Sequence, residues 1–542
     1  MGRPRLRVIK SSDVAEMKLF RDAIMVVYGT SFFTDAYDLL CIPFVTRLLG
    51  RIYYQVEGDP KPGTLPPIVS ASVTSAAFLG SLAGHLFFGW LGERMDRKRL
   101  YFTPLFLIII SSIASGLSTG FGTLCFFRFC LGFGIGCDHL LSLSIISKYS
   151  LKSTRRNFMS GICAFKFFGN SFAAAVTATV AAALQALPHS ISVSEADYAW
   201  RLVLVLGALP PALTFYWRKK VVSDMAESAG CTPIMYFDYR TYLDASWDTA
   251  AAKVPQVQEE EEERFGLLSG EFVRRHGVHL LGTTATWFLL DIAFYSLNYL
   301  YQKDIMRAVG WTSKATASMN VFMDDVLLIA LAQAGTILYG TLGSVLSFEF
   351  IQTTGPFKIQ LVGIFFMTAF LLCIAFPFDI FWTNHKIWFL LAYGSILFSA
   401  NLGPNLTMFI MPIEMFPKRL SFTCHGLSAA SGKAGAMIAA FGFQYAMQSR
   451  DESEVERGYP LGIGVRNSLF VLAAINALGF LFTLLLVPGS KKKSLDDDKE
   501  EIEVVYVKFE SYHRYLHSFW SRFFCLFDVD VGYVWRGILD FK

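Results

Sequence analysis

Charged residues are scarce in this chain: Asp, Glu, Lys and Arg together make up only 17% of its 542 residues. Hydrophobic residues make up 53%, aromatic residues 15%, and the mean hydropathy is +0.43. Soluble globular domains carry about 25% charged residues. The composition therefore excludes an ordinary soluble protein and indicates a chain that lies largely within a membrane.

The sequence also lacks the features of several other protein classes. Its net charge is only +4 and is spread along the chain, whereas nucleic-acid-binding proteins gather Lys and Arg on one face. The nine cysteines are scattered, and several lie in apolar runs, as do Cys125, Cys130 and Cys163. We find no nucleophile–base pair, Walker loop or metal-ligand cluster. We therefore predict a protein that is not an enzyme, needs no cofactor or metal, and binds no nucleic acid.

Long hydrophobic runs are abundant. A bilayer core about 30 Å thick needs roughly 20 apolar residues of helix. A first set of six such segments lies near residues 22–48, 67–91, 101–119, 122–147, 157–187 and 199–217. A second set of six lies near residues 278–300, 325–351, 357–378, 386–413, 420–447 and 467–487. The sequence thus predicts an all-α membrane protein with twelve transmembrane helices in two six-helix bundles, which span residues 1–217 and 278–489.

Two polar stretches lie outside these bundles. Residues 218–277 contain the run Glu259 to Glu263 and lack apolar periodicity, which predicts a central linker. Residues 490–542 mix charged and aromatic side chains and are too interrupted by charge to span a bilayer. We predict a cytosolic C-terminal tail there, which lies on the membrane surface, docks a partner, or is a flexible extension.

Positive charges in the short loops predict the orientation, because Lys and Arg stay on the cytosolic side during insertion. The first twenty residues are basic and lack the apolar core of a removable signal peptide. The basic residues after the second, fourth, sixth and tenth segments are Arg94, Arg97, Lys98, Arg99, Lys148, Lys152, Arg155, Arg156, Arg218, Lys219, Lys220, Lys418 and Arg419. We therefore expect a multi-pass protein, of the plasma membrane, with both termini and the linker in the cytosol.

Charged side chains inside the predicted membrane helices are candidates for a functional site. Each costs at least about 2.5 to 3.5 kcal/mol at the bilayer centre. Asp35 and Asp38 are three residues apart and share one helical face. The others are Asp138, Lys166, Asp291 and Lys433. Their balance of acid and base favours a shared site, although some could serve only to pair neighbouring helices.

The loop after the second segment provides a resemblance to a known family. Residues 89–98 read GWLGERMDRK, which resembles the cytosolic gating motif of the major facilitator superfamily. The resemblance implies that Gly89, Glu93 and Arg97 take part in gating. The second glycine of the family motif is Asp96 here.

Three longer stretches narrow the resemblance. Residues 32–54, 282–304 and 403–446 resemble the plant phosphate:proton symporters, and the likeness covers roughly residues 17–490. It implies the major facilitator fold and symport of inorganic phosphate with protons by alternating access through a lipid bilayer.

The resemblance also implies roles for individual residues. Trp287, Asp291 and Tyr295 are spaced by four and so lie on one helical stripe, which offers an indole N–H, a carboxylate and a phenol. An aromatic stripe alone is more typical of core packing, but the central carboxylate is not. By resemblance, the phosphate ligands are Trp287, Asp291, Tyr295, Asn405, Lys166 and His139, and the proton-coupling residues are Asp38 and Asp138, with Lys433 as their partner, and Asp35.

The chain departs from the family pattern at several of these positions. In the fourth segment the family has a tyrosine and a proline where this sequence has His139 and Leu140, and Lys166 replaces a phosphate-binding glutamine. A downstream glutamate of the family is Lys148, and a second latch motif near residues 352–356 lacks its acid and base. The site is therefore more cationic. Two alternatives stay open: a carrier of sulfate, arsenate or an organic phosphate, and a non-transporting phosphate sensor or partner subunit.

Overall fold

The fold is built from helices. The computed structural model describes residues 11–56, 62–92, 102–149, 155–227, 266–267, 269–300, 302–311, 318–382, 384–417 and 419–487, and these residues contain no β-strand. Each of the twelve predicted membrane segments corresponds to one or more helices. The linker residues 228–265 and the tail residues 490–542 lie outside the described residues.

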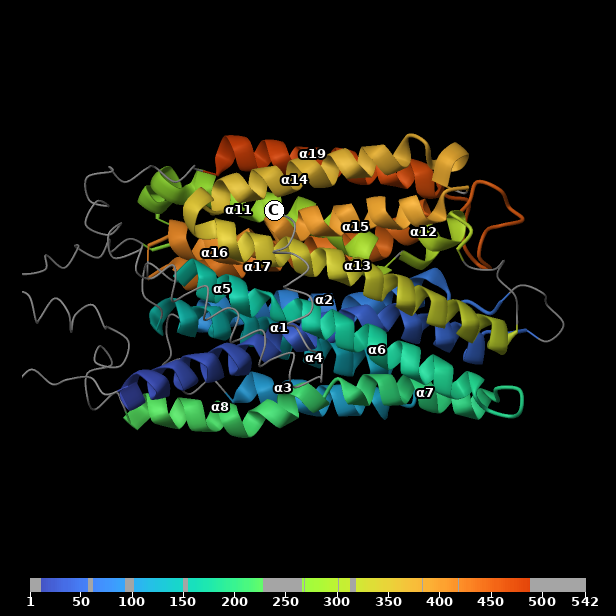
Figure 1. The fold of residues 1–542 in the computed structure, drawn as a ribbon, viewed down its shortest axis with the longest axis horizontal. Coiled ribbons are helices and arrows are strands. Elements are labelled where there is room, and N and C mark those ends of the chain that lie inside the picture. Colours follow the sequence, from blue (N-terminus) through green and yellow to red (C-terminus); the bar gives the residue numbers. More distant parts are fainter. Residues whose placement is uncertain are drawn as a thin grey trace, which may run out of the picture. The chain divides into compact units, whose positions relative to one another are not determined.

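The first half supplies eight labelled helices (Figure 1). They are α1 (Ser11–Tyr53), α2 (Pro67–Leu91), α3 (Thr103–Gly116), α4 (Phe121–Tyr149), α5 (Arg155–Cys163), α6 (Phe165–Gln185), α7 (Val193–Leu206) and α8 (Leu209–Glu227). Two predicted segments each form two helices. One is divided at Ala164, between α5 and α6. The other is divided between α7 and α8, just before Pro210 and Pro211.

The second half has more interruptions. Its helices are α11 (Gly270–Tyr295), η3 (Ser296–Leu300), α12 (Gln302–Ala308), α13 (Met319–Thr354), α14 (Pro356–Ala375), η4 (Phe378–Trp382), α15 (Lys386–Leu402), α16 (Pro404–Met415), α17 (Ser421–Ile438), η5 (Ala439–Phe443), α18 (Gln444–Ala446) and α19 (Gly464–Leu486). Gly403 separates α15 from α16, and Pro404 opens α16, because proline is tolerated in the first turn of a helix. Between α13 and α14, Gly355 has φ +82°, which only glycine adopts readily.

Two helices extend into the residues that were predicted as the linker. α8 continues to Glu227 and α11 begins at Gly270, whereas the predicted linker ran from residue 218 to 277. Charged residues at these ends hid the helical continuation, because a hydropathy window responds to the apolar core of a helix and not to its polar ends.

Apolar composition suits these helices to a bilayer. Among the described residues, nine helical stretches are long and apolar enough to cross a membrane, and α3 is a shorter apolar helix. Many large apolar side chains point outward; Leu485, Phe376 and Leu338 are each about two-thirds exposed or more. Lipid would cover such side chains.

Close helix packing holds the first half together and joins it to the second. A Cβ added at Gly84 of α2 would lie 2.5 Å from the Phe133 carbonyl oxygen of α4, so the small residue permits this approach. Across the two halves, α17 packs along α2, and α13 packs along α6 (Figure 1). A cavity between the two halves is lined by the buried charged residues Lys166, Asp291 and Lys433.

Candidate functional site

A cavity between the two halves gathers the side chains that the sequence predicted as phosphate ligands. Helices α2, α4 and α6 form one wall, and α11, α16 and α17 form the other. The polar lining residues are His85, His139, Lys166, Trp287, Asp291, Tyr295, Asn405 and Lys433. Residues from six predicted segments thus surround one space, which is the arrangement that a shared binding site requires.

The stripe on α11 forms one wall of this cavity. Trp287, Asp291 and Tyr295 are all buried, at 5%, 7% and 4% exposure. Gly432 on α17 lies directly against the stripe, because a Cβ added there would lie 2.6 Å from both the Trp287 Nε1 atom and the Asp291 Oδ2 atom. Only glycine at position 432 therefore leaves room for the Trp287 indole and the Asp291 carboxylate in their observed positions.

We predict that Gly432→Ala reduces phosphate uptake at least tenfold while the protein still folds. The added methyl group must displace Trp287 or Asp291, and small displacements of binding groups cost about that much. The matched control is Gly442→Ala in η5, where a Cβ meets nothing within 4 Å. Equal uptake by the two variants would show that the stripe does not require this close contact.

Lys433 connects the two halves inside the cavity. Its ammonium donates a hydrogen bond of 2.8 Å to the Tyr295 hydroxyl and lies 3.7 Å from Asp35 Oδ1 on α1. The sequence predicted Asp38 and Asp138 as the partners of this lysine, whereas in this structure it pairs with Asp35. Asp35 is the carboxylate that pairs with Lys433, while Asp38 and Asp138 are both paired with arginines.

Lys166 brings a second cation to the cavity. Its ammonium lies 4.4 Å from the centre of the Phe409 ring and 5.8 Å from that of Phe32, which are cation–π distances. No carboxylate of the described residues forms an ion pair with it. Close by, Asn405 donates an amide hydrogen bond of 2.6 Å to Asn401. The charge of Lys166 therefore remains available to an anion.

His139 lies deep in the same wall and is 1% exposed. Its ring stacks on Phe32 with centroids 4.4 Å apart and an interplanar angle of 11°. Its Nε2 atom lies 3.9 Å from Asp35 Oδ2, and this atom has no hydrogen-bond partner in the described part of the chain. The ring is thus held firmly with one polar atom unsatisfied.

Asp38 has a partner that the sequence reasoning missed. Arg128 on α4 donates two hydrogen bonds of 2.9 Å to the two oxygens of this carboxylate, and its Nε donates to the Val73 carbonyl at 3.0 Å. Arg128 is fully buried. A lone arginine within the apolar run 122–147 was the available signal, because an unpaired charge there would be costly.

Asp138 pairs with Arg218, and this pairing corrects the sequence interpretation of that arginine. Arg218 had been counted with the loop cations after the sixth segment, but it lies within α8 and is only 1% exposed. Its guanidinium hydrogen-bonds both Asp138 oxygens and donates to the Val27 carbonyl at 3.0 Å. Burial is tolerated because the positive charge is paired with a carboxylate and both terminal nitrogens donate hydrogen bonds, while the Nε atom has no partner among the described residues.

One end of the cavity is closed by contacts between the halves. Gly89 approaches Gly426, where an added Cβ would lie 3.1 Å from the Gly89 Cα atom, and Thr423 donates to the Gly89 carbonyl at 2.9 Å. Arg156 and Glu414 form an ion pair of 2.8 Å between α5 and α16. The predicted gating residues Glu93 and Arg97 lie outside the described residues.

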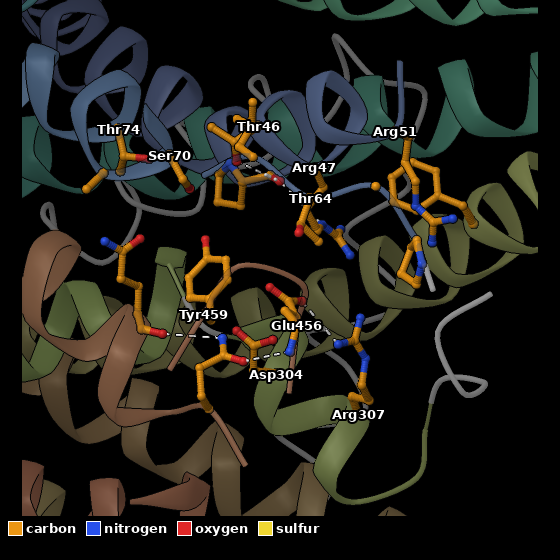
Figure 2. Close-up of a pocket in the computed structure, with 18 of the residues that line it drawn as sticks. Thr46, Arg47, Arg51, Thr64, Ser70, Thr74, Asp304, Arg307, Glu456 and Tyr459 are labelled. Carbon is orange, nitrogen blue, oxygen red and sulfur yellow. Dashed lines mark hydrogen bonds and ion pairs between the residues drawn. The ribbon is translucent and has the colours of Figure 1, made fainter. Parts of the chain in front are cut away.

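At the other end, where α1 ends, a larger cavity separates the halves. Figure 2 shows Arg47 and Arg51 on one side of it, and Asp304, Arg307 and Glu456 on the other. It holds about 970 Å³ of empty space, part of it open to solvent. Arg307 pairs with Glu456 at 3.3 Å. This cavity could not be predicted from the sequence, because its walls come from segment ends and loops.

Similar proteins establish the family. The family model for sugar (and other) transporters matches residues 23–222 and 247–503. The inorganic phosphate transporter 1-6 of Oryza sativa subsp. japonica is 50% identical over 530 residues, which cover 92% of this chain and 96% of the relative. The chain belongs to the plant inorganic phosphate transporter family.

Other members of this inorganic phosphate transporter family agree over the same length. The probable inorganic phosphate transporter 1-7 of Arabidopsis thaliana is 48% identical over 529 residues, covering 93% of this chain and 96% of the relative. The low affinity inorganic phosphate transporter 1 of Petunia hybrida is 48% identical over 523 residues, covering 92% and 96%. The resemblance drawn from residues 32–54, 282–304 and 403–446 is therefore confirmed.

Solved structures confirm the fold of this family member. The proton:xylose symporter XylE, a major facilitator protein, superposes with a TM-score of 0.65 at 15% identity, covering 88% of this chain and 98% of that one. An inward-open form of XylE from E. coli gives a TM-score of 0.59 at 14% identity, with coverages of 88% and 98%. The predicted all-α major facilitator fold is correct, and the chain is a multi-pass membrane protein.

Proposed function

We propose that this protein carries inorganic phosphate together with protons across a membrane by alternating access. The observation that carries the proposal is the cavity in which Lys433, Lys166 and Asp291 meet the aromatic donors of α11. Inorganic phosphate transporters are its relatives at 46–50% identity, which supports the same substrate. Phosphate and protons are thus the substrates of the proposed transport cycle.

The cavity has the hydrogen-bonding groups that phosphate needs. Bare phosphate oxygens accept hydrogen bonds and are attracted to cations, while a P–OH group needs an acceptor. Lys433, Lys166 and the Tyr295 hydroxyl supply the first kind of partner, and Asp291 supplies the second. Cations from both halves would therefore close on one anion.

Proton coupling is best explained by Asp35. It lies between the Lys433 ammonium and the His139 ring, on the half opposite to Lys433. Protonation of Asp35 would release Lys433 from this ion pair and leave its charge for phosphate, so the two substrates would favour each other. Asp38 and Asp138 form ion pairs with Arg128 and Arg218 in this conformation, so those pairs would have to open before either carboxylate could exchange a proton with the cavity.

Membrane potential would then drive accumulation. Moving one net positive charge inward yields about 2.3 kcal/mol per 100 mV. If more than one proton accompanies each monovalent phosphate, the transported load is positive and the potential contributes to uptake.

The loop charges support an orientation for this cycle. Lys and Arg residues cluster in the loops at the end closed by Gly89, Gly426 and the Arg156–Glu414 pair, which we assign to the cytosol. The larger cavity at the end of α1 then faces outward. We place the protein in the plasma membrane, with both termini in the cytosol and with Gly89, Glu93 and Arg97 in the inner gate.

Uptake of radiolabelled phosphate by yeast that lacks its own phosphate transporters tests the proposal. We expect uptake that rises as the external medium is acidified and that a protonophore abolishes. Purified protein should bind phosphate as well. Absence of both uptake and binding would refute the proposal, while binding without uptake would favour a phosphate sensor or partner subunit.

A further inference from the structure

Two histidines in the central cavity carry ring nitrogens without hydrogen-bond partners. His85 on α2 and His139 on α4 both line the cavity beside Asp291 and Lys433, with ring centroids 6.1 Å apart. Each is 1% exposed, and neither Nε2 atom has a partner within the described ranges of the chain. Buried polar atoms are normally paired, so these two nitrogens are candidates for hydrogen bonds to a bound ligand.

The other nitrogen of each ring fixes the tautomer. His85 Nδ1 lies 2.7 Å from the Ser81 carbonyl oxygen. His139 hydrogen-bonds the backbone of Ser31, whose own N–H is used within α1, so the Ser31 carbonyl is the acceptor. A carbonyl can only accept, so Nδ1 carries the hydrogen in both rings. In a neutral imidazole, Nε2 is then an acceptor.

The surroundings favour the neutral form of both rings. They are buried, and the ammonium groups of Lys166 and Lys433 already occupy the same cavity, which disfavours a further positive charge. Asp35 lies near His139 but is paired with Lys433. The titratable and charged groups that face the two histidines are Asp35 on α1, Lys166 on α6, Asp291 on α11, and His425 and Lys433 on α17.

We propose that Nε2 of His85 and Nε2 of His139 join Asp291 as the acceptors that the P–OH groups of bound phosphate meet, and so select a protonated tetrahedral oxyanion over an unprotonated one. This inference rests on the proposed function and adds the class of oxyanion that the cavity takes. Dihydrogen phosphate and dihydrogen arsenate each bring two hydroxyl groups. Sulfate brings none at neutral pH, so it would leave these buried acceptors unpaired and facing its own oxygens.

Competition binding to the purified full-length protein tests this selection. In the wild type, arsenate is expected to displace radiolabelled phosphate at similar concentration, while a hundredfold excess of sulfate does not. In His85→Gln and His139→Gln, the glutamine amide can turn an N–H toward the anion. The preference for phosphate over sulfate should then fall about tenfold in each single variant and about a hundredfold in the double variant, since each leaves one acceptor fewer.

His425→Gln is the matched control. His425 is equally buried and lacks ring-nitrogen partners among the described residues, but it packs against Trp287 and does not line the cavity. Its replacement should leave the preference unchanged. Equal affinity of the wild type for sulfate and phosphate, or an unchanged preference in the histidine variants that still bind phosphate, would overturn this inference and leave phosphate binding intact.

A wild-type protein that binds neither oxyanion would instead refute the proposed function. If the double variant does not fold, the two single variants and the ratio of the wild-type affinities for arsenate and sulfate still test whether the histidines select a protonated oxyanion.

Discussion

Asp291→Asn is expected to reduce phosphate uptake at least a hundredfold without unfolding the protein. The asparagine keeps the shape of the side chain but removes the charge that balances the lysines of the cavity, and its amide would present a donor where P–OH needs an acceptor. Sites built to hydrogen-bond a substrate hydroxyl lose about four orders of magnitude when that pairing fails, so a hundredfold loss is a conservative expectation.

Asp379→Asn is the matched control for this substitution. Asp379 is an exposed carboxylate that pairs with Arg466 at the molecular surface, whereas Asp291 is buried in the cavity. It should transport like the wild type in the same yeast assay, at equal expression. Full activity of Asp291→Asn would remove this carboxylate from the phosphate site.

The second large effect concerns stability. Arg218→Gln should destabilise the protein by about 3 to 5 kcal/mol, because it leaves the Asp138 carboxylate buried without its cation. The double variant Asp138→Asn and Arg218→Gln should recover much of this loss, since it removes both charges. Thermal melting of the detergent-solubilised protein, followed by size-exclusion chromatography, measures the difference.

Arg466→Gln provides the comparison, because its ion pair with Asp379 is exposed and such pairs contribute little. Its melting temperature should stay close to that of the wild type. If Arg218→Gln melts no lower than Arg466→Gln, the buried pair contributes nothing to folding, and Asp138 is free for another role.

The order of the helices and the α11 stripe could be predicted from sequence because both are local properties. Hydrophobic length marks each span, and a spacing of four residues fixes that Trp287, Asp291 and Tyr295 share a face. Helix breaks at Ala164 and Gly403 were missed, since the apolar composition continues across them. A hydropathy window cannot detect a change of backbone direction within an apolar run.

The partners of the buried charges could not be predicted, because they depend on packing between distant segments. Arg218 sits in a basic run that looks like a loop, yet its carboxylate partner is 80 residues away in the sequence. Likewise Lys433 meets Asp35 and not Asp38, although the two acids share a helical face. The spacing of the two acids does not show which of them faces the lysine, and only the three-dimensional structure decides this.

Divergence from the family pattern also gains a physical meaning here. His139 and His85 together give the cavity two acceptors that are held in place by backbone carbonyls, while Lys166 adds a cation to the same wall. The more cationic character read from the sequence is thus balanced by acceptor groups that a protonated anion can satisfy.

The most direct test of the account is to measure phosphate and proton movement together in proteoliposomes that contain the purified protein and an internal pH-sensitive dye. We predict that external phosphate enters and acidifies the interior, and that Asp291→Asn abolishes both signals. Entry of phosphate without acidification would contradict proton coupling, and absence of phosphate entry into well-sealed vesicles would contradict transport itself.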